Sequence, residues 1–242
     1  MSEPTGGREP GGAVSLVYAH LRTRIVNGEI PPGTKINIES VARSLEVSQT
    51  PVRETLQKLE ADGLLDYSPG RGYMTTPVLD AEGLESLFEL RFLIEPWSTR
   101  VVAEDRITNP GRRLRAELER FEAEISEGGD LRQLVLAHDS RFHGLILKAT
   151  GNPNVCQAFE QSQAHLHLFR LSPVDRDGQI ALREHTRIVE AIADCDPDAA
   201  EEAMRAHLQQ SYERSAHVFD SESLGGLKRA NAYRAHRHRI LR

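Results

Sequence analysis

The stretch VSQTPVRETL, residues 47–56, decides how the N-terminal third of this 242-residue chain folds. Ser48 is a residue type that caps helices well, and Pro51 falls in the first helical turn, where its missing backbone N–H costs nothing. Apolar residues follow at a helical spacing until Gly63, a residue type that commonly ends helices. The stretch therefore predicts a helix that begins after Ser48 and has one apolar face.

The segments around this helix complete a small domain. A short helix is expected before it, from the capping residue Asn37, with only a turn at residues 46–48 between the two helices. Two strand-like pieces follow and flank SPGRG at residues 68–72, which predicts a β-hairpin, or wing. The expected elements are helices at 13–26, 37–45 and 48–63 and strands at 64–67 and 73–76. Together they predict a winged helix-turn-helix over residues 13–78, after a disordered N-terminus at 1–12.

The second helix of a helix-turn-helix presents its first turns to base edges in the DNA major groove. Its exposed polar side chains suit that role, because glutamine pairs with adenine, arginine with guanine or phosphate, and hydroxyls with phosphate. The hairpin tip would lie along the minor groove or the DNA backbone. The candidate DNA-binding residues are Ser48, Gln49, Thr50, Arg53, Gly70, Arg71 and Gly72. The alternative is a helix-turn-helix that never touches DNA, and the pattern alone leaves both open.

The charge balance does not favour nucleic-acid binding. The chain carries a formal net charge of −6, and residues 1–78 hold eight Lys and Arg against nine Asp and Glu. Proteins that neutralise phosphates usually present a basic surface, so binding here would depend on local placement of charge. We therefore expect two copies to act together, as a homodimer on a double-stranded DNA operator.

Residues 79–218 show helical periodicity and no strand pattern. Proline and glycine interrupt the periodicity at nearly every boundary. An antiparallel bundle of six or seven helices is the natural packing, so the fold class is expected to be mainly α. Six helical segments are expected, at 81–104, 111–127, 131–150, 155–171, 180–194 and 198–219. Residues 219–242 are expected to form a basic C-terminal tail, since residues 228–242 hold six basic and no acidic residues.

Three histidines and one aspartate in this half are placed for metal binding. Asp139 and His143 are four residues apart on one helix, whereas His185 and His207 each fall in an apolar stripe of another helix. Imidazoles and a carboxylate that converge inside a bundle suit a divalent ion, with positions left for water or ligand. The ion is expected to be zinc, with nickel, manganese or iron as alternatives. Any one of these histidines alone is more often a hydrogen-bonded core residue.

Three further histidines, His138, His165 and His167, are weaker candidates as ligands. By helical geometry His138 points roughly 100° away from Asp139. The two cysteines lie far apart in sequence and are expected to be reduced thiols rather than metal ligands. Without an 18-residue apolar run or a targeting segment, the chain is expected to be cytoplasmic and to have no membrane partner.

Residues 14–78 resemble the signature of the GntR family of DNA-binding regulators. The matching residues are the stretch at 47–56, Pro32-Gly33, Leu59-x-x-Asp62-Gly63-Leu64 and Gly70-Arg71-Gly72. The resemblance implies that the exposed residues of the second helix of the helix-turn-helix, which we call the reading helix, and the wing glycines contact the operator. This chain has Gln49 and Glu39 where the family often has arginine, which implies a different operator and weaker non-specific binding.

Residues 80–218 resemble the FCD domain, the C-terminal domain of the FadR subfamily of these regulators. The matching motifs are Asp139-x-x-Phe142-His143, Gly151-Asn152, Glu184-His185-x-x-Ile188 and Met204-x-x-His207-Leu208. The metal-binding branch of this domain uses an aspartate and three histidines that match Asp139, His143, His185 and His207. The fatty-acyl-responsive members lack this set, which argues against an acyl-CoA ligand. The six expected helices favour the shorter, VanR-like branch.

The resemblance also gives Arg91 a role, because the family has an arginine that faces the effector cavity at this position. A guanidinium near a metal ion with an open position suits a small carboxylate or hydroxy-acid effector. The alternative is that Arg91 pairs with Glu95, four residues on, at the surface of the helix.

These features predict a sequence-specific transcriptional regulator, expected to be a repressor, whose operator binding is controlled by an effector at the metal site. Two alternatives stay open. A metal-dependent enzyme could use the same ligands to activate water, and a regulator could carry a purely structural metal. The chain has no nucleophile motif, phosphate loop or dinucleotide fingerprint, so it is not expected to be an enzyme.

Overall fold

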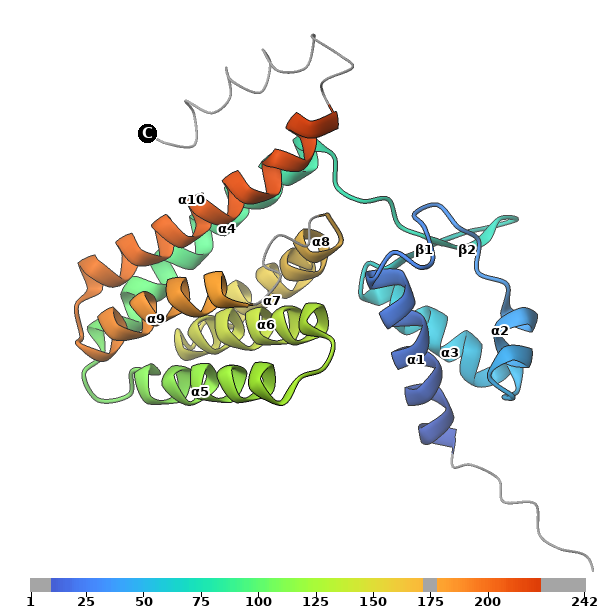
Figure 1. Cartoon of the computed structure of the whole chain (residues 1–242), viewed down its shortest axis with the longest axis horizontal. Coiled ribbons are helices and arrows are strands. Elements are labelled where there is room, and N and C mark those ends of the chain that lie inside the picture. The colour runs from blue at the N-terminus through green and yellow to red at the C-terminus, as the bar shows by residue number, and fades with distance from the viewer. Residues whose placement is uncertain (1–9, 172–177, 223–242) are drawn as a thin grey trace, which may run out of the picture. The chain divides into compact units, whose positions relative to one another are not determined.

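The computed structural model describes residues 10–171 and 178–222 and shows two compact units that divide between Val78 and Leu79 (Figure 1). We call the described residues before this boundary the winged unit and those after it the helical unit. Each unit is described by itself. In the described residues the only sheet has two strands and belongs to the winged unit.

The winged unit consists of three helices and a hairpin. In chain order these are α1 (Pro10–Val26), α2 (Ile38–Ser44), α3 (Gln49–Ala61), β1 (Leu65–Ser68) and β2 (Gly72–Thr75). The strands pair antiparallel, from Leu65 opposite Thr75 to Ser68 opposite Gly72, so the wing turns at residues 69–71. The predicted winged helix-turn-helix is confirmed, and Asn37 caps α2 as expected by accepting from the Ser40 amide.

The first helix begins earlier than predicted. Disorder is predicted through Gly12, but Pro10 to Gly12 already belong to α1. Proline is well accommodated in a first helical turn because its missing N–H is not needed there. The rest of that predicted segment, residues 1–9, lies outside the described residues.

The packing of α3 against α1 fixes which side of α3 is exposed. Val52, Leu56 and Leu59 are completely buried, and their spacing places them on one face, as the sequence predicts. The Tyr18 hydroxyl of α1 donates a hydrogen bond to Asp62 Oδ2, at 2.5 Å, just after the end of α3. Burial, reinforced by the Asp62 carboxylate, raises the pKa of Tyr18 to about 12.

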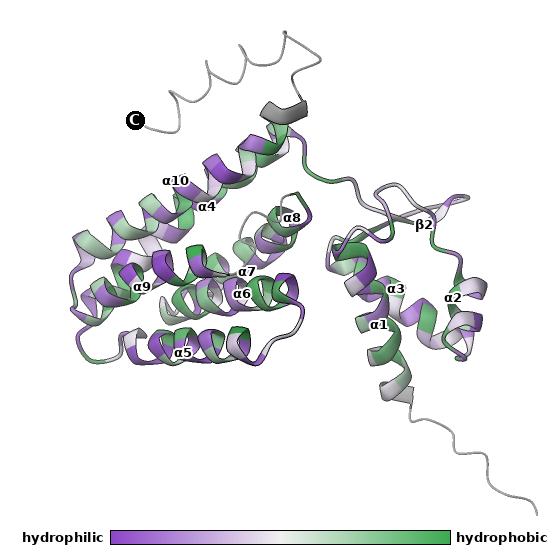
Figure 2. Ribbon diagram, in the orientation of Figure 1, coloured by the Kyte–Doolittle hydropathy of each residue, from purple (hydrophilic) through white to green (hydrophobic). Residues whose placement is uncertain are grey.

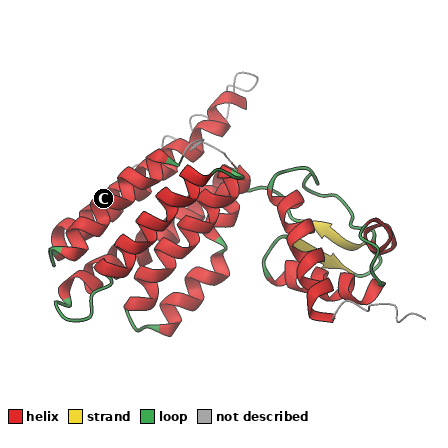
Figure 3. Cartoon of the chain, turned by 60° about the horizontal axis from the view of Figure 1, so that its bottom comes forward, coloured by secondary structure: helices red, strands yellow, loops and turns green. Residues whose placement is uncertain are grey.

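The helical unit contains helices and no strand within its described residues (Figure 3). The helices are α4 (Ala81–Glu104), α5 (Gly111–Glu127), α6 (Leu131–Ala149), α7 (Pro153–Ser162), α8 (Ala164–Leu171), α9 (Gln179–Ala193) and α10 (Pro197–Glu222). The long helices α4 and α10 pack against each other. Figure 2 shows hydrophobic residues recurring along the helices rather than covering them, as expected when one face of each helix packs inward. The predicted mainly α fold is confirmed.

One apolar core holds five of these helices together. It includes Val102 of α4, Leu114 of α5, Phe142 of α6, Ile188 of α9 and Met204 of α10, all buried. Each such side chain contributes about 1.5–3 kcal/mol of transfer free energy when it leaves water. The predicted metal ligands lie on the same buried faces of α6, α9 and α10, so the core also positions the candidate site.

The segment predicted as one helix over 155–171 is two helices. The chain breaks at Gln163, whose φ of +48° places it in the left-handed region between α7 and α8. Neither glycine nor proline marks this position, so the sequence pattern could not show the break. The count is therefore seven in the part of the helical unit that the structure describes, the upper value predicted. Six helices were the reason for favouring the VanR-like branch, so the seventh helix removes that support.

The last helix also extends beyond its predicted end. The basic tail is predicted to start at Phe219, but α10 continues to Glu222, and Phe219 packs against the buried cluster formed by Leu84, Phe88, Tyr212 and Ala216. The remainder of the predicted tail, residues 223–242, and the predicted break at Ser172-Pro173 lie outside the described residues. Among the helices of 10–171 and 178–222, none is both long and apolar enough to cross a membrane.

Candidate metal centre and nucleic-acid interface

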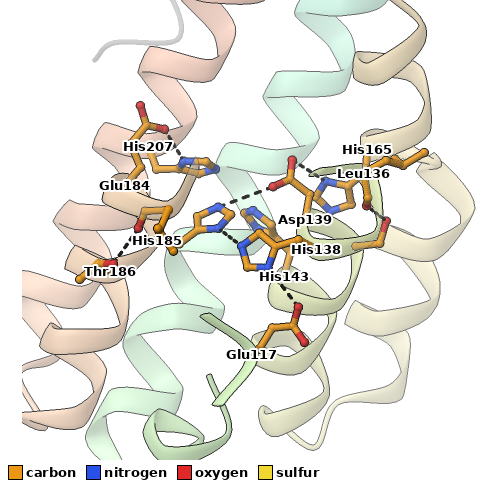
Figure 4. A network of polar contacts seen from close by, with 12 residues as sticks. Glu117, Leu136, His138, Asp139, His143, His165, Glu184, His185, Thr186 and His207 are labelled. Atoms are coloured by element: carbon orange, nitrogen blue, oxygen red, sulfur yellow. Dashed lines mark hydrogen bonds and ion pairs between the residues drawn. The ribbon is translucent and has the colours of Figure 1, made fainter. Parts of the chain in front are cut away.

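The four predicted metal ligands come together inside the helical unit. Asp139 and His143 are carried by α6, His185 by α9 and His207 by α10 (Figure 4). The three imidazoles can each offer a nitrogen such that these atoms lie within 4.8 Å of one another. Oδ1 of Asp139 lies 3.9 Å from Nε2 of His185. The three rings are buried, and the aspartate is partly exposed.

Several polar atoms at the centre of this group are buried without a hydrogen-bond partner in the described residues. They are Nε2 of His143, Nε2 of His185 and Oδ1 of Asp139. Buried polar groups in native proteins are nearly always satisfied, so such atoms require an explanation. Imidazole nitrogen and carboxylate oxygen are ligands that divalent transition metals accept, and the residues present therefore fit a metal ion.

Two of the imidazoles have a carboxylate directly behind them. The Nδ1 atom of His143 faces a carboxylate oxygen of Glu95, from α4. The Nδ1 atom of His207 lies 2.8 Å from Oε2 of Glu184, from α9. Because metal-bound histidines usually donate the N–H of their other ring nitrogen to such an acceptor, both contacts leave Nε2 for the ion.

The third imidazole reaches its carboxylate through another histidine. The Nδ1 atom of His185 lies 2.9 Å from Nε2 of His138, and Nδ1 of His138 lies 3.0 Å from Oε1 of Glu117, on α5. The sequence makes His138 a weaker ligand candidate, but the structure places its Nε2 atom directly behind His185. A ring nitrogen of His138 also lies within 4.8 Å of a carboxylate oxygen of Asp139.

Each of these three glutamates, which we call the outer carboxylates, is also paired with an arginine. The pairs are Arg91 Nε with Glu95 Oε1 at 2.5 Å, Arg141 Nε with Glu117 Oε1 at 2.8 Å, and Arg214 Nη1 with Glu184 Oε1 at 2.6 Å. The sequence pattern predicts none of the three outer carboxylates as part of the metal site, although Glu95 is expected beside Arg91 and Glu184 falls in a quoted motif. A signal was available, because Glu117 interrupts the buried stripe formed by Leu114 and Phe121 on α5, and a charge in an apolar stripe needs a partner.

Burial sets the charge states in the site. Burial lowers the pKa of His207 despite the Glu184 carboxylate beside it, and it holds the pKa of His185 well below its usual range. Burial acts to raise the pKa of Glu95, but the charge of Arg91 and the contact with His143 outweigh it and hold that pKa well below its usual range. Neutral imidazoles backed by ionised carboxylates are the states that metal binding requires.

Arg91 lies inside the helical unit, whereas the alternative from the sequence placed it at the surface of the helix. Arg91 does pair with Glu95, but both side chains are almost completely buried. Its Nε and Nη2 atoms point to the two Glu95 oxygens, at 2.5 and 3.4 Å, and its guanidinium carbon lies 5.2 Å from the centre of the Phe88 ring. The edge formed by Nε and Nη2 is therefore occupied, and an effector would have to meet the edge formed by Nη1 and Nη2.

His165, also a weaker candidate from sequence, lies next to the predicted ligands. It comes from α8, is 8% exposed, and neither ring nitrogen has a hydrogen-bond partner among the residues described. Its Nδ1 atom lies 3.9 Å from Oδ2 of Asp139. Burial holds the pKa of His165 well below its usual range, so the ring is neutral and offers one donor and one acceptor.

The predicted DNA-binding residues lie at the start of α3 and at the tip of the wing. Ser48, Gln49, Thr50 and Arg53 are exposed at the start of α3. Ser48 occupies the N-cap position, as predicted, but its side chain makes no capping hydrogen bond. A hydroxyl and helix N-terminal amides that are not engaged with each other suit a phosphate.

The wing tip carries one arginine between two glycines. Gly70 and Gly72 both have a φ of +83°, a backbone conformation that glycine adopts readily and other residues rarely. Arg71 between them is exposed. The glycines therefore allow the tight turn that presents this side chain at the end of the hairpin.

Comparison with known proteins assigns both units. Residues 14–74 match the gntR family of bacterial regulatory proteins, and residues 86–210, more than half of the chain, match the FCD domain. The uncharacterized HTH-type transcriptional regulator YdhC of Bacillus subtilis is 28% identical over 205 residues, which are 84% of this chain and 91% of that protein. The transcriptional repressor RspR of Escherichia coli is 29% identical over 198 residues, 80% of this chain and 85% of its own.

Solved structures show the same fold. A putative GntR regulator from Rhodococcus sp. RHA1 superposes with a TM-score of 0.67 at 21% identity, over 85% of this chain and 98% of that one. McbR/YncC of Escherichia coli superposes with a TM-score of 0.64 at 19% identity, over 87% and 98%. The chain therefore belongs to the GntR family of bacterial transcriptional regulators and carries an FCD domain in its helical unit.

Proposed function

We propose that this regulator is a repressor whose operator binding is controlled by a small carboxylate or hydroxy-acid, coordinated to a divalent metal ion in the helical unit. The ion is held by Asp139, His143, His185 and His207. The observation that carries the proposal is the set of buried, unpartnered atoms of Asp139, His143 and His185, with the His207 ring among them. Repression is supported by relatives named as repressors, among them RspR of Escherichia coli and a probable D-xylose utilization operon repressor of Paenarthrobacter nicotinovorans.

The ligand set supports zinc, with nickel, manganese or iron as alternatives. Three nitrogens and one oxygen are ligand types that all these ions accept, and an ion that takes a fifth or sixth ligand keeps a position for the acid. The arginine partners balance the outer carboxylates, and imidazoles that hold a metal ion are neutral. A divalent ion beside the single charge of Asp139 then leaves one net positive charge, which attracts an anion.

The side chains around the centre support a small acid as that anion. Its carboxylate would coordinate the ion and meet the Nη1 and Nη2 edge of Arg91, the edge that Glu95 does not occupy. The neutral His165 ring, next to Asp139, has one donor and one acceptor to satisfy. A hydroxyl group both donates and accepts, which is why a hydroxy-acid fits this position.

A homodimer is supported by an apolar strip on α4. Leu93 is 76% exposed and Trp97, four residues on, is 45% exposed, so both lie on the same side of the helix. Large exposed apolar residues that are grouped in this way mark interaction surfaces. Pairing of two helical units would bring two winged units to the half-sites of one operator, which offsets the near-neutral charge of each.

The test measures metal content, operator binding and turnover on the purified full chain. We expect about one zinc per chain, operator affinity that changes with at least one member of a panel of small carboxylates and hydroxy-acids, and no turnover of any of them. His207→Ala should lose the metal and the response to the acid but keep operator binding. His217→Ala, on the same helix but exposed, is the matched control and should behave as the wild type.

Other results would favour the alternatives. Metal-dependent turnover of an acid would identify an enzyme, and a bound metal with no effect of any acid would identify a purely structural ion. Linkage adds a quantitative check: if an acid weakens operator binding by some factor, the operator must weaken binding of that acid by the same factor.

A further inference from the structure

The arrangement behind His185 differs from that behind the other two imidazoles. His143 and His207 each meet an outer carboxylate directly, whereas His185 reaches Glu117 only through His138. The motifs of the resemblance do not include His138, and the proposed function does not use it. The inference that follows rests on the proposed metal centre and concerns how that centre is held.

The hydrogen bonds that run from His185 through His138 to Glu117 can have only one donor-to-acceptor direction when a metal ion is bound. A metal ion on Nε2 of His185 leaves the proton of that neutral ring on Nδ1, which then donates to Nε2 of His138. His138 therefore carries its own proton on Nδ1 and donates it to Glu117, at 3.0 Å. Glu117 also accepts from Nε of Arg141, at 2.8 Å. Every N–H donor in this series of hydrogen bonds therefore has an acceptor.

Stacking fixes both rings in this orientation. The His138 ring lies on the Phe121 ring with centres 3.9 Å apart and planes 2° from parallel. The His185 ring lies in the same way on Phe142, with centres 3.9 Å apart and planes 4° from parallel. Both histidines are fully buried, so neither ring can turn over without breaking its hydrogen bonds and its stack.

We propose that His138 is a positioning residue of the metal centre, which holds His185 in the tautomer and orientation that direct Nε2 at the ion. Through Glu117 it makes α5, a helix that supplies no candidate ligand, part of the site. Partners of this kind typically change metal affinity by about 10–100-fold. The metal centre then depends on five helices, α4, α5, α6, α9 and α10, although its ligands come from three.

Two substitutions at position 138 separate positioning from packing. His138→Phe keeps a flat ring for the stack on Phe121 but can neither accept from His185 nor donate to Glu117. His138→Gln loses the ring but offers an acceptor and a donor on its amide. Zinc affinity of the full chain is measured by competition with a chromophoric chelator. As a folding control, each metal-free variant should show a cooperative unfolding transition in urea.

We expect His138→Phe to bind one zinc per chain about 10–100-fold more weakly than the wild type, and His138→Gln to recover at least half of that loss on a logarithmic scale. Equal affinity in His138→Phe and the wild type would overturn the proposal. So would a Gln variant as weak as the Phe variant, or a complete loss of zinc from both, because the latter would make His138 a direct ligand. A wild-type chain that binds no zinc would instead refute the metal centre itself, and this inference with it.

Discussion

The winged unit and the helical unit expose their functional side chains to opposite environments. The DNA-binding candidates lie on the surface and come from two short stretches, residues 48–53 and 70–72. The metal candidates are largely buried and come from helices that are distant in sequence. A surface site of adjacent residues tolerates loss of one side chain without harm to the fold. A buried site of charged residues does not, because each removed partner leaves another charge unpaired in a poorly solvated environment.

The largest effect is expected where a charge is removed from the helical unit. Glu95→Ala deletes the carboxylate between Arg91 and His143 and leaves the Arg91 guanidinium buried without its partner. We expect a loss of about 3–5 kcal/mol in the free energy of unfolding of this unit. Trp97, the single tryptophan of the chain, lies in α4, so its fluorescence during urea unfolding reports on the correct unit.

Glu104→Ala is the matched control for this substitution. Glu104 is on the same helix and also pairs with an arginine four residues away, but both partners are exposed. Exposed pairs of this kind contribute little to stability, so the control should unfold close to the wild type. Similar losses of unfolding free energy in the two variants would show that breaking the buried pair of Arg91 and Glu95 costs no more than breaking an exposed pair. That result would contradict the contrast between the two units.

A smaller effect is expected from a side chain of the winged unit, and on binding rather than on folding. Arg53→Ala should lower operator affinity by about 1–3 kcal/mol, because Arg53 is exposed on the second turn of the reading helix. Zinc binding and unfolding of the helical unit should not change. Fluorescence anisotropy with a labelled operator, repeated at several salt concentrations, measures the loss.

The control for Arg53 is Arg24→Ala, which removes the same charge from the end of α1, where it pairs with Glu29 in an exposed contact. A loss as large in Arg24→Ala as in Arg53→Ala would indicate that only net charge matters. A salt slope reduced by about one in Arg53→Ala would indicate a phosphate contact, whereas a change in preferred operator sequence would indicate a base contact.

The same contrast explains what could be predicted from the sequence. The winged unit follows from local signals: capping at Asn37, glycines at the wing, and the apolar spacing of Val52 and Leu56. The four proposed ligands could also be found, because each lies in a recognisable motif on an apolar stripe. For the outer carboxylates the sequence gives at most a sign that Glu117 needs a partner; it cannot give the histidine partners, which are 21 to 48 residues away, because no helical period relates positions on different helices.

The break at Gln163 and the role of His138 are beyond sequence patterns for different physical reasons. A left-handed residue that is neither glycine nor asparagine depends on the surrounding packing rather than on its own preference. The offset of His138 from Asp139 along α6 follows from helical geometry, but the partners that His138 meets are set by the packing of α5 and α9 on α6. Local geometry gives the direction of a side chain, and tertiary packing gives its partner.

The smallest predicted effect is a pH-dependent one in the winged unit. Folding raises the pKa of Tyr18 from 10.0 to about 12, so the hydrogen bond to Asp62 should stabilise the folded state fully below pH 10 and lose its effect as the pH rises through about 12. Because the side chain is partly exposed, we expect a contribution of only about 1 kcal/mol. Tyr18→Phe, which removes the hydroxyl and keeps the ring, should therefore be less stable than the wild type by that amount near neutral pH. Urea unfolding followed by far-ultraviolet circular dichroism should show the advantage of the wild type falling as the pH rises from about 10 to about 12, whereas a constant difference would mean that the hydroxyl proton is not involved and that the lost contact is packing alone.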